Sequence, residues 1–223
     1  MPGYTTIQQL IRIGGIDYRI RALSDLQQFS DPDGHAARLG ISSAQWCLFG
    51  QLWPAGQLLA EAMSSFDIGG KRILEIGCGL GLASLVLKRR GADVVASDIH
   101  PDAEPFLAYN AALNGLPAVP YRQLQWDVPL PALGRFDVII GSDILYERGH
   151  ALLLASLMDR HLNPTAEIVV SDPGRGNSNP FTRELARMGF QASEVRAAMG
   201  PSDLAPFRGR LLHYSRPAAT AAA

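Results

Sequence analysis

The sequence predicts a single α/β domain built on a doubly wound, mainly parallel sheet with helices on both faces. Apolar segments of strand length alternate with segments of helical periodicity from residue 72 to about residue 190. Such alternation is typical of parallel strands that are joined by right-handed helical crossovers. The segment FDVII at 136–140 is apolar throughout, as expected of a strand that is covered on both faces.

The first unit of this sheet contains a glycine-rich turn. We expect a strand at 73–76, a helix at 82–89 and a second strand at 94–98, and the sequence GCGLG fills the turn at 77–81. Asp98 ends the second strand. A β-loop-α-β unit of this kind binds a nucleotide-like cofactor at the carboxyl ends of its strands.

The other elements follow from periodicity and from residues that favour helix ends and turns. The remaining helices are expected at 54–63, 101–113, 150–162 and 181–188, and the remaining strands at 119–124, 166–170, 191–197 and 210–214. The last two strands are close in sequence, which favours an antiparallel hairpin at the sheet edge.

The two ends of the chain are harder to interpret. Isoleucines on both sides of Gly14-Gly15 suggest short strands, which would form either an edge hairpin or a flexible arm. We therefore expect an N-terminal extension at 1–45, the α/β domain at 46–216 and a flexible tail at 217–223.

Composition limits the classes of function. The 223 residues carry a net charge of −1, which argues against a general nucleic-acid binder. No apolar run approaches the roughly 20 residues needed to span a bilayer, and the first residues lack the pattern of a secretory signal. Cys47 and Cys78 are too few for a disulfide framework or a metal site. We expect a cytoplasmic protein without a metal ion.

The glycine spacing discriminates between ligand classes. A phosphate-binding P-loop needs Lys followed by Ser or Thr after its last glycine, and here Leu82 and Ala83 follow Gly81. A dinucleotide fold has the spacing G-x-G-x-x-G, but Leu82 occupies the position of its third glycine. This difference weakens the NAD hypothesis without excluding it.

Glu75 lies two residues before Gly77 in an otherwise apolar strand, where a carboxylate is costly unless it is paired or near water. The pattern E-x-G-x-G-x-G, followed by a strand that ends in Asp98, resembles the cofactor motif of class I S-adenosylmethionine methyltransferases. The resemblance implies S-adenosylmethionine as cofactor. It also implies a Rossmann-like sheet of seven strands, mainly parallel, with an antiparallel last strand.

The resemblance also assigns cofactor contacts. Asp98 would hold the ribose hydroxyls, and Gly77, Gly79 and Gly81 would let the backbone approach the methionine part of the cofactor. Asp127 matches the acid that meets the adenine amino group, and Trp126 would pack on the adenine face. Asp98 could instead cap a helix, and Asp127 could serve a turn alone.

The end of the fourth predicted strand is where class I enzymes bind the methyl acceptor. Here it reads Ser142-Asp143-Ile144-Leu145-Tyr146, without the prolines of the Asp-Pro-Pro-Tyr motif of some DNA and RNA methyltransferases. Asp-x-x-Tyr resembles methyltransferase family 16, the seven-strand protein-lysine methyltransferases and their relatives. Ser142 is expected beside the cofactor.

Two further segments carry this resemblance, which covers roughly residues 45 to 195. LWPAG at 52–56 is similar to the family's segment before the cofactor motif, and its Trp53 would line the cofactor site. Asp-Pro-Gly-Arg at 172–175 resembles the electron-transfer-flavoprotein β-subunit lysine methyltransferases. Arg175 would either hold an acidic substrate patch or structure its loop.

The resemblance implies an enzyme that N-methylates a protein lysine. Presenting a neutral lysine amine near pH 7.4 costs about 4 kcal/mol. Asp143 would orient the incoming ammonium, and Tyr146 would pack beside its stem or accept a hydrogen bond. Alternatively, Asp143 caps a following helix and Tyr146 packs on it. A small-molecule amine as acceptor, and a non-catalytic cofactor-binding interaction module, remain open alternatives.

Overall fold

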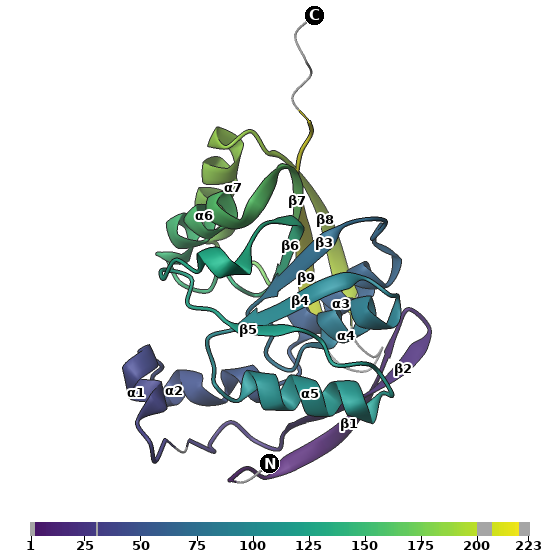
Figure 1. Ribbon diagram of the computed structural model, residues 1–223, viewed down its shortest axis with the longest axis vertical. Helices are drawn as coiled ribbons and strands as arrows, with labels where there is room; N and C mark the ends of the chain where they lie inside the picture. The colour runs from purple at the N-terminus through teal and green to yellow at the C-terminus, as the bar shows by residue number, and fades with distance from the viewer. Residues whose placement is uncertain (1–2, 30, 200–206, 219–223) are drawn as a thin grey trace, which may run out of the picture.

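A computed structural model describes residues 3–29, 31–199 and 207–218. Its main feature is a seven-stranded sheet in the order β5-β4-β3-β6-β7-β9-β8 (Figure 1). The strands are β3 (Arg72–Ile76), β4 (Asp93–Asp98), β5 (Tyr121–Gln123), β6 (Phe136–Ser142), β7 (Leu162–Asp172), β8 (Gln191–Met199) and β9 (Phe207–Arg216). Strand β9 alone runs in the direction opposite to the other six strands. The predicted mainly parallel sheet with an antiparallel last strand is confirmed.

Helices cover both faces of this sheet, as predicted. They are α3 (Pro54–Ser65), α4 (Leu82–Arg89), α5 (Ala103–Leu113), α6 (His150–His161) and α7 (Ser178–Arg187), with a short 3-10 helix, η2, at Pro131–Leu133. Helix α7 begins three residues before the predicted start at 181. Strand β7 begins at Leu162 rather than 166, because Leu162 already pairs with Phe136. The pairing shifts register after Phe136, and the polar residues 163–165 give no sign of a strand in the sequence.

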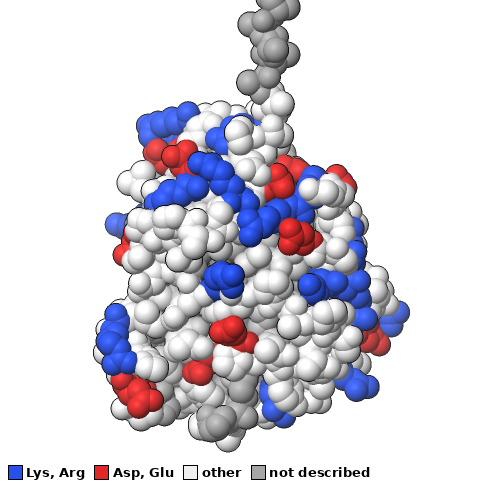
Figure 2. All heavy atoms as spheres, viewed as in Figure 1, with Lys and Arg blue, Asp and Glu red and all other residues white. Residues whose placement is uncertain are grey.

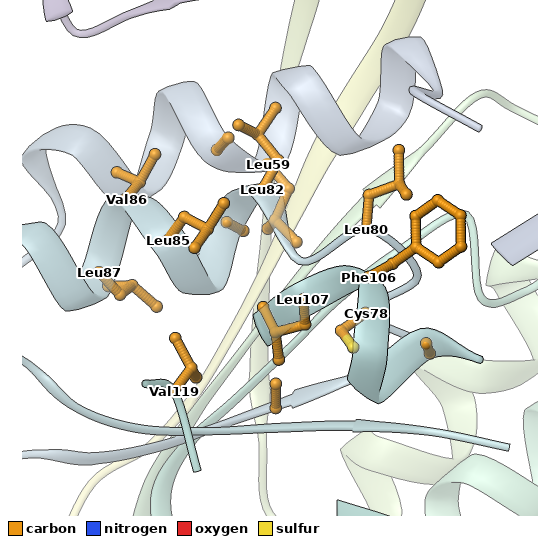
Figure 3. Packing of buried hydrophobic residues seen from close by; sticks show 14 of the residues in the cluster. Leu59, Cys78, Leu80, Leu82, Leu85, Val86, Leu87, Phe106, Leu107 and Val119 are labelled. Carbon is orange, nitrogen blue, oxygen red and sulfur yellow. The ribbon is translucent and has the colours of Figure 1, made fainter. Parts of the chain in front are cut away.

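Alternate side chains of the central strands enter two different cores, because successive residues of a strand point to opposite faces. Ile73 packs on the face covered by α3, α4 and α5, whereas Leu74 packs on the face covered by α6 and α7. Figure 3 shows the first core at close range, with Leu59, Leu82 and Leu85 filling the space between helices α3 and α4. These two cores fix the carboxyl ends of the strands at one edge of the sheet.

The N-terminal residues form a separate hairpin of β1 (Thr6–Ile13) and β2 (Ile16–Leu23) that packs on α5 (Figure 1). Its inner residues Tyr18 and Ile20 are buried in the first core. The side chain of Asn110 on α5 accepts from Arg21 N at 2.8 Å and donates to the carbonyls of Arg21 and Leu80, both at 3.3 Å. The hairpin is therefore neither an edge of the main sheet nor a flexible arm.

Three short helices connect this hairpin to α3: α1 (His35–Leu39), α2 (Ser43–Trp46) and the 3-10 helix η1 (Cys47–Gly50). Helix α2 begins with a capping box between Ser42 and Gln45. Most of the predicted tail at 217–223 lies outside the described residues. None of the described helices combines the length and the apolarity that crossing a membrane requires.

Charged side chains of both signs lie together on the surface. Figure 2 shows Lys and Arg in a band across the upper part of one face, with Asp and Glu beside them. Arg90, at the end of α4, is partly buried and donates to the carbonyls of Met63 and Phe66 at the end of α3. These bonds satisfy carbonyls that have no partner within the helix. Arg90 therefore joins the ends of α3 and α4.

Candidate active site

A cavity of about 590 Å³ lies at the carboxyl ends of the parallel strands. Its walls come from the loops after β3, β4, β5, β6 and β7 and from residues 40–56. The cavity brings together every site residue that the sequence suggested: Trp53, Glu75, Gly77, Gly79, Gly81, Asp98, Trp126, Asp127, Ser142, Asp143 and Tyr146. The structure thus joins the expected cofactor and acceptor residues in one space.

The glycine turn is tightly enclosed at two of its three glycines. Gly79 has φ 50°, and a Cβ atom there would lie 2.7 Å from the carbonyl oxygen of Phe49. Gly81 has φ 78°, and a Cβ atom there would lie 2.2 Å from Leu107 Cδ1. Only glycine meets both the left-handed conformation and the close approach, so the turn is needed for packing as well as for access to the cavity.

Glu75 is a buried residue, only 3% exposed, whose carboxylate lines the cavity. Its Oε2 accepts from the backbone N of Ser84, at 2.8 Å, and from Ser84 Oγ. Ser84 lies in the first turn of α4, where a negative charge is favourable. Burial nevertheless raises the pKa of Glu75 to about 7. A positively charged ligand in the cavity would favour the ionised form.

Asp98 is a second buried carboxylate at the end of β4. It accepts from the backbone N of Gly79 at 2.8 Å and of His100 at 2.9 Å. Burial raises its pKa despite these bonds. The N-cap of α5 is Asp102, not Asp98, so the alternative that Asp98 caps a helix is wrong. Asp98 instead links the glycine turn to the chain after β4.

An aromatic group forms the wall beside Asp98, and the sequence did not single it out. The His100 ring stacks on Phe49 with centroids 3.8 Å apart and meets Trp46 edge-on at 4.2 Å. Burial lowers the pKa of His100 to about 3, and its Nδ1 accepts from the backbone N of Asp102. The neutral ring therefore carries its proton on Nε2. The cluster of aromatic residues at 46–53 was the available signal.

Trp53 and Ser142 both lie near the start of α3. Trp53 is the N-cap residue of α3, and its Nε1 donates to the carbonyl of Leu48 at 2.8 Å. Trp53 is 37% exposed and lies at the rim of the cavity. Ser142 ends β6 and faces Gly56, where a Cβ atom would lie 3.7 Å from Ser142 Oγ. Both residues therefore line the cavity, and their contact with the cofactor stays a prediction.

Aromatic rings also form the wall on the acceptor side. His150 meets Trp126 edge-on at 5.2 Å and Tyr146 at 4.5 Å between centroids, and its Nδ1 bonds with the carbonyl of Ile144. Its side chain is only 11% exposed, so His150 is part of this wall. Tyr146 is 42% exposed and Asp127 is also exposed, which places both at the mouth of the cavity.

Asp143 stands at the boundary of cavity and solvent in an unusual conformation. Its φ of 50° is the only positive value at a non-glycine position among the described residues. Its backbone N donates to Ser171 O at 2.8 Å. No helix begins between Asp143 and His150, so the alternative that Asp143 caps a helix is wrong.

Arg175 holds the carboxylate of Asp143 from the loop after β7. Arg175 Nε donates to Asp143 Oδ1 at 2.8 Å, and Arg175 Nη2 donates to Oδ2 at 2.6 Å. Two parallel bonds of this kind fix both position and orientation. Arg175 was expected either to hold an acidic substrate patch or to structure its loop. In the structure it makes a contact within the protein, with Asp143.

The residues of the cavity fit S-adenosylmethionine. This cofactor combines ribose hydroxyls and an adenine ring with a cationic methionine end, which carries a sulfonium and an ammonium group. The cavity offers two buried acids, Glu75 and Asp98, whose pKa values are raised by burial. A cationic ligand would favour their ionised forms, and the carboxylates could accept the hydrogen bonds of its hydroxyl and ammonium groups.

Comparison with known proteins gives a consistent result. The Protein N-lysine methyltransferase METTL21A of Danio rerio is 33% identical over 187 residues, which cover 78% of this chain and 84% of that protein. The electron transfer flavoprotein beta subunit lysine methyltransferase of Mus musculus is 28% identical over 156 residues, or 68% of this chain. The match covers 54% of that relative, so the chain spans about half of its length.

Solved structures share the fold. The magnesium protoporphyrin IX methyltransferase (ChlM) of Synechocystis PCC 6803 with bound SAM matches with a TM-score of 0.55 at 18% identity, covering 73% of this chain and 77% of that one. A family model described as lysine methyltransferase matches residues 43–185, the segment that contains the cavity's glycine turn and both of its loops at Asp143 and Arg175. This chain therefore belongs to the lysine methyltransferase family.

Proposed function

We propose that this protein transfers the methyl group of S-adenosylmethionine to the side-chain nitrogen of a lysine in a protein substrate. One observation carries the proposal: Asp143 and Tyr146, at the mouth, open into the same cavity as the buried acids Glu75 and Asp98. A long, flexible lysine side chain suits this arrangement, because it reaches inward from a protein surface. Membership of the family supports lysine as the acceptor.

Residues of the inner part of the cavity would hold the cofactor. Asp98 would accept from the ribose hydroxyls, and Glu75 would offset the positive charge of the methionine end. Trp126 would pack on the adenine, Asp127 would accept from its amino group, and Trp53 would line the rim. When bound, S-adenosylmethionine supplies an electrophilic methyl group, which the acceptor's lone pair takes as the carbon–sulfur bond breaks and leaves its electron pair on sulfur.

The acceptor enters beside Asp143. The carboxylate of Asp143 accepts from the incoming lysine nitrogen and orients it. Tyr146 and His150 line the path of the apolar part of the lysine side chain. The enzyme has to position the nucleophile and exclude water. The rings of Trp126, His150 and Tyr146 contribute to that exclusion, because they pack edge to face along one wall.

A labelling experiment tests this proposal. The purified protein is incubated with a cell lysate and S-adenosylmethionine that carries a radioactive methyl group. We expect label in a discrete protein band, release of that label as peptides after protease treatment, and methyl-lysine after hydrolysis. Label that passes a small-molecule filter without protease would instead support the alternative of a small amine. Calorimetry that detected NAD but not S-adenosylmethionine would contradict both.

A further inference from the structure

We propose that Arg175 is a positioning residue that neutralises Asp143, so that the lysine acceptor binds in its reactive form, without the proton. This inference rests on the proposed function. It explains why Asp143, the carboxylate proposed to bind the lysine, is already paired with a cation of the same chain. Arg175 would set the charge at the acceptor site rather than contact an acidic patch of the substrate.

The first support is the geometry of the pair. Both oxygens of Asp143 receive a guanidinium nitrogen of Arg175, at 2.8 and 2.6 Å. The side chain of Asp143 is 18% exposed and that of Arg175 is 49% exposed, so the pair lies at the mouth where a lysine would enter. Each carboxylate oxygen has a second lone pair, which remains for the acceptor nitrogen.

The second support is the charge of the cavity. Among the described residues that line it, Arg175 is the only Lys or Arg, whereas Glu75, Asp98, Asp127 and Asp143 are acids. Without Arg175 the mouth would hold an acceptor ammonium too well, because an opposite charge at close range favours the protonated form of an amine. The guanidinium stays charged at all relevant pH values, so its effect is constant.

The third support is the anchoring of Arg175 before any substrate arrives. Arg175 lies between Gly174 and Gly176, with φ of 89° and 87°. The turn is held because Gly174 N donates to Asp172 Oδ1 at 3.0 Å, and Arg210 of β9 grips Asp172 Oδ2 through Nε and Nη2 at 3.0 and 2.8 Å. An arginine that waited for an acidic substrate patch would not need this support.

The next residues of the turn connect it to the loop that carries Asp143. Asn177 Nδ2 donates to the carbonyl of Leu145 at 2.9 Å, and Asp143 N donates to Ser171 O. The two loops are therefore joined by backbone and side-chain bonds as well as by the ion pair. Substituting Arg175 should leave Asp143 near its present position, so that the charge changes more than the shape.

The chemical step that Arg175 assists is loss of one acceptor proton. The N–H bond breaks, its electron pair stays on nitrogen, and the proton passes to solvent at the open mouth. The free lone pair is then available for the methyl group. A neighbouring cation makes the ammonium form less favourable and thus lowers the pKa of the bound amine.

Other titratable groups face this region and have to be separated from the effect. Glu147 and Tyr146 follow Asp143 in the same loop, His150 Nε2 lies 3.6 Å from Glu147 Oε2, and Asp172 lies behind Arg175. Across the cavity stand Asp127, Glu75, Asp98 and His100. All of these remain in an Arg175 variant, so the difference between variant and wild type isolates the guanidinium.

The test measures kcat and KM for labelling of the lysate band from about pH 6 to about pH 10, at saturating S-adenosylmethionine. The variants are Arg175→Gln, Arg175→Lys and, as matched control, Arg148→Gln, which removes an exposed arginine from the loop after β6. Thermal unfolding and calorimetric binding of S-adenosylhomocysteine, compared across all proteins, report fold and cofactor site without using activity.

For Arg175→Gln we expect the rise of kcat with pH to move up by about one unit, which lowers kcat about tenfold near neutral pH and restores it at alkaline pH. KM should fall, because the freed Asp143 holds the ammonium more tightly. Arg175→Lys should largely restore the wild-type profile, and Arg148→Gln should follow it throughout.

Two results would overturn the inference while leaving the proposed function intact. One is a higher KM with an unmoved kcat profile, which would make Arg175 a substrate contact. The other is an equal loss of kcat at every pH, which would make its role purely structural. If wild-type protein labels no protein band at all, the proposed function fails, and this inference fails with it.

Discussion

The two halves of the cavity are built differently. In the half proposed to bind the cofactor, Glu75 and Asp98 are buried and accept from backbone N–H groups of the glycine turn, of α4 and of His100 after β4. In the acceptor half, Asp143 is bound by the side chain of Arg175, and Tyr146 is 42% exposed. The first half is thus closed and held by backbone groups, whereas the second half is open to solvent and held by a side-chain ion pair. This difference fits the proposal that a small cofactor binds inside and a larger protein substrate binds at the mouth.

Substitution of Gly79 should damage the cofactor half most. In Gly79→Ala the new methyl group meets the Phe49 carbonyl in a left-handed backbone, and we expect a loss of about 3 kcal/mol in the free energy of unfolding. Gly91→Ala is the matched control, because Gly91 has φ 81° but nothing within 4 Å of its Cβ. Equal losses in urea unfolding would mean that backbone strain alone matters.

The raised pKa of Glu75 should be visible in the pH dependence of the free energy of unfolding. Its folded pKa of about 7 exceeds the ordinary value of 4.5, so the folded state binds more protons than the unfolded state between these limits. The contribution of Glu75 to the free energy of unfolding should therefore be fully present below about pH 4.5 and should be lost as pH rises through about 7, by about 3 kcal/mol at most. Glu75→Gln should remove this part of the slope in unfolding titrations. An unchanged slope would assign it to another group, such as Asp98.

Loss of Asp143 should affect the acceptor half alone. In Asp143→Ala we expect methyl transfer to fall roughly thirtyfold, because a hydrogen bond to a charged group contributes about 2 kcal/mol. Calorimetric binding of S-adenosylhomocysteine should stay unchanged. Asp159→Ala, an exposed substitution on α6, serves as control. A parallel loss of cofactor binding would show that the two halves are not independent.

Asp98→Asn should weaken cofactor binding, with a smaller effect than the substitutions described above. The amide keeps one acceptor oxygen but loses the charge, so affinity should fall by about tenfold in calorimetry. Asp93→Asn lies at the exposed opposite end of the same strand, β4, and should bind as wild type does. If Asp98→Asn also bound normally, the ribose assignment would be wrong.

How far the sequence could predict each half depends on the distances along the chain. Glu75, the glycines and Asp98 lie within one β-loop-α-β unit, so their spacing alone placed them in a common site. The contact between Asp143 and Arg175 joins residues 32 positions apart, and no local pattern indicates such a pair. The same holds for the stacking of His100 on Phe49.

Element boundaries were missed for a similar reason. Leu162 begins β7 through its pairing with Phe136, a contact across the sheet that overrides the unfavourable Pro164. The ring of His150 packs against Trp126 and Tyr146, and its sequence neighbours do not indicate these contacts. Local propensity predicts which elements exist, and tertiary contacts decide where they begin and which side chains they bury.

The bonds of Asn110 tie the hairpin to the glycine turn. Its fully buried amide is shared between Arg21 on β2 and the carbonyl of Leu80. Separating the hairpin from α5 would leave that amide without its partners on Arg21. The hairpin and the glycine turn should therefore open together as one cooperative unit. In native-state hydrogen exchange the amides of β2 and of the glycine turn should share a single opening free energy, and ligand in the cavity should slow exchange in a hairpin that it never touches.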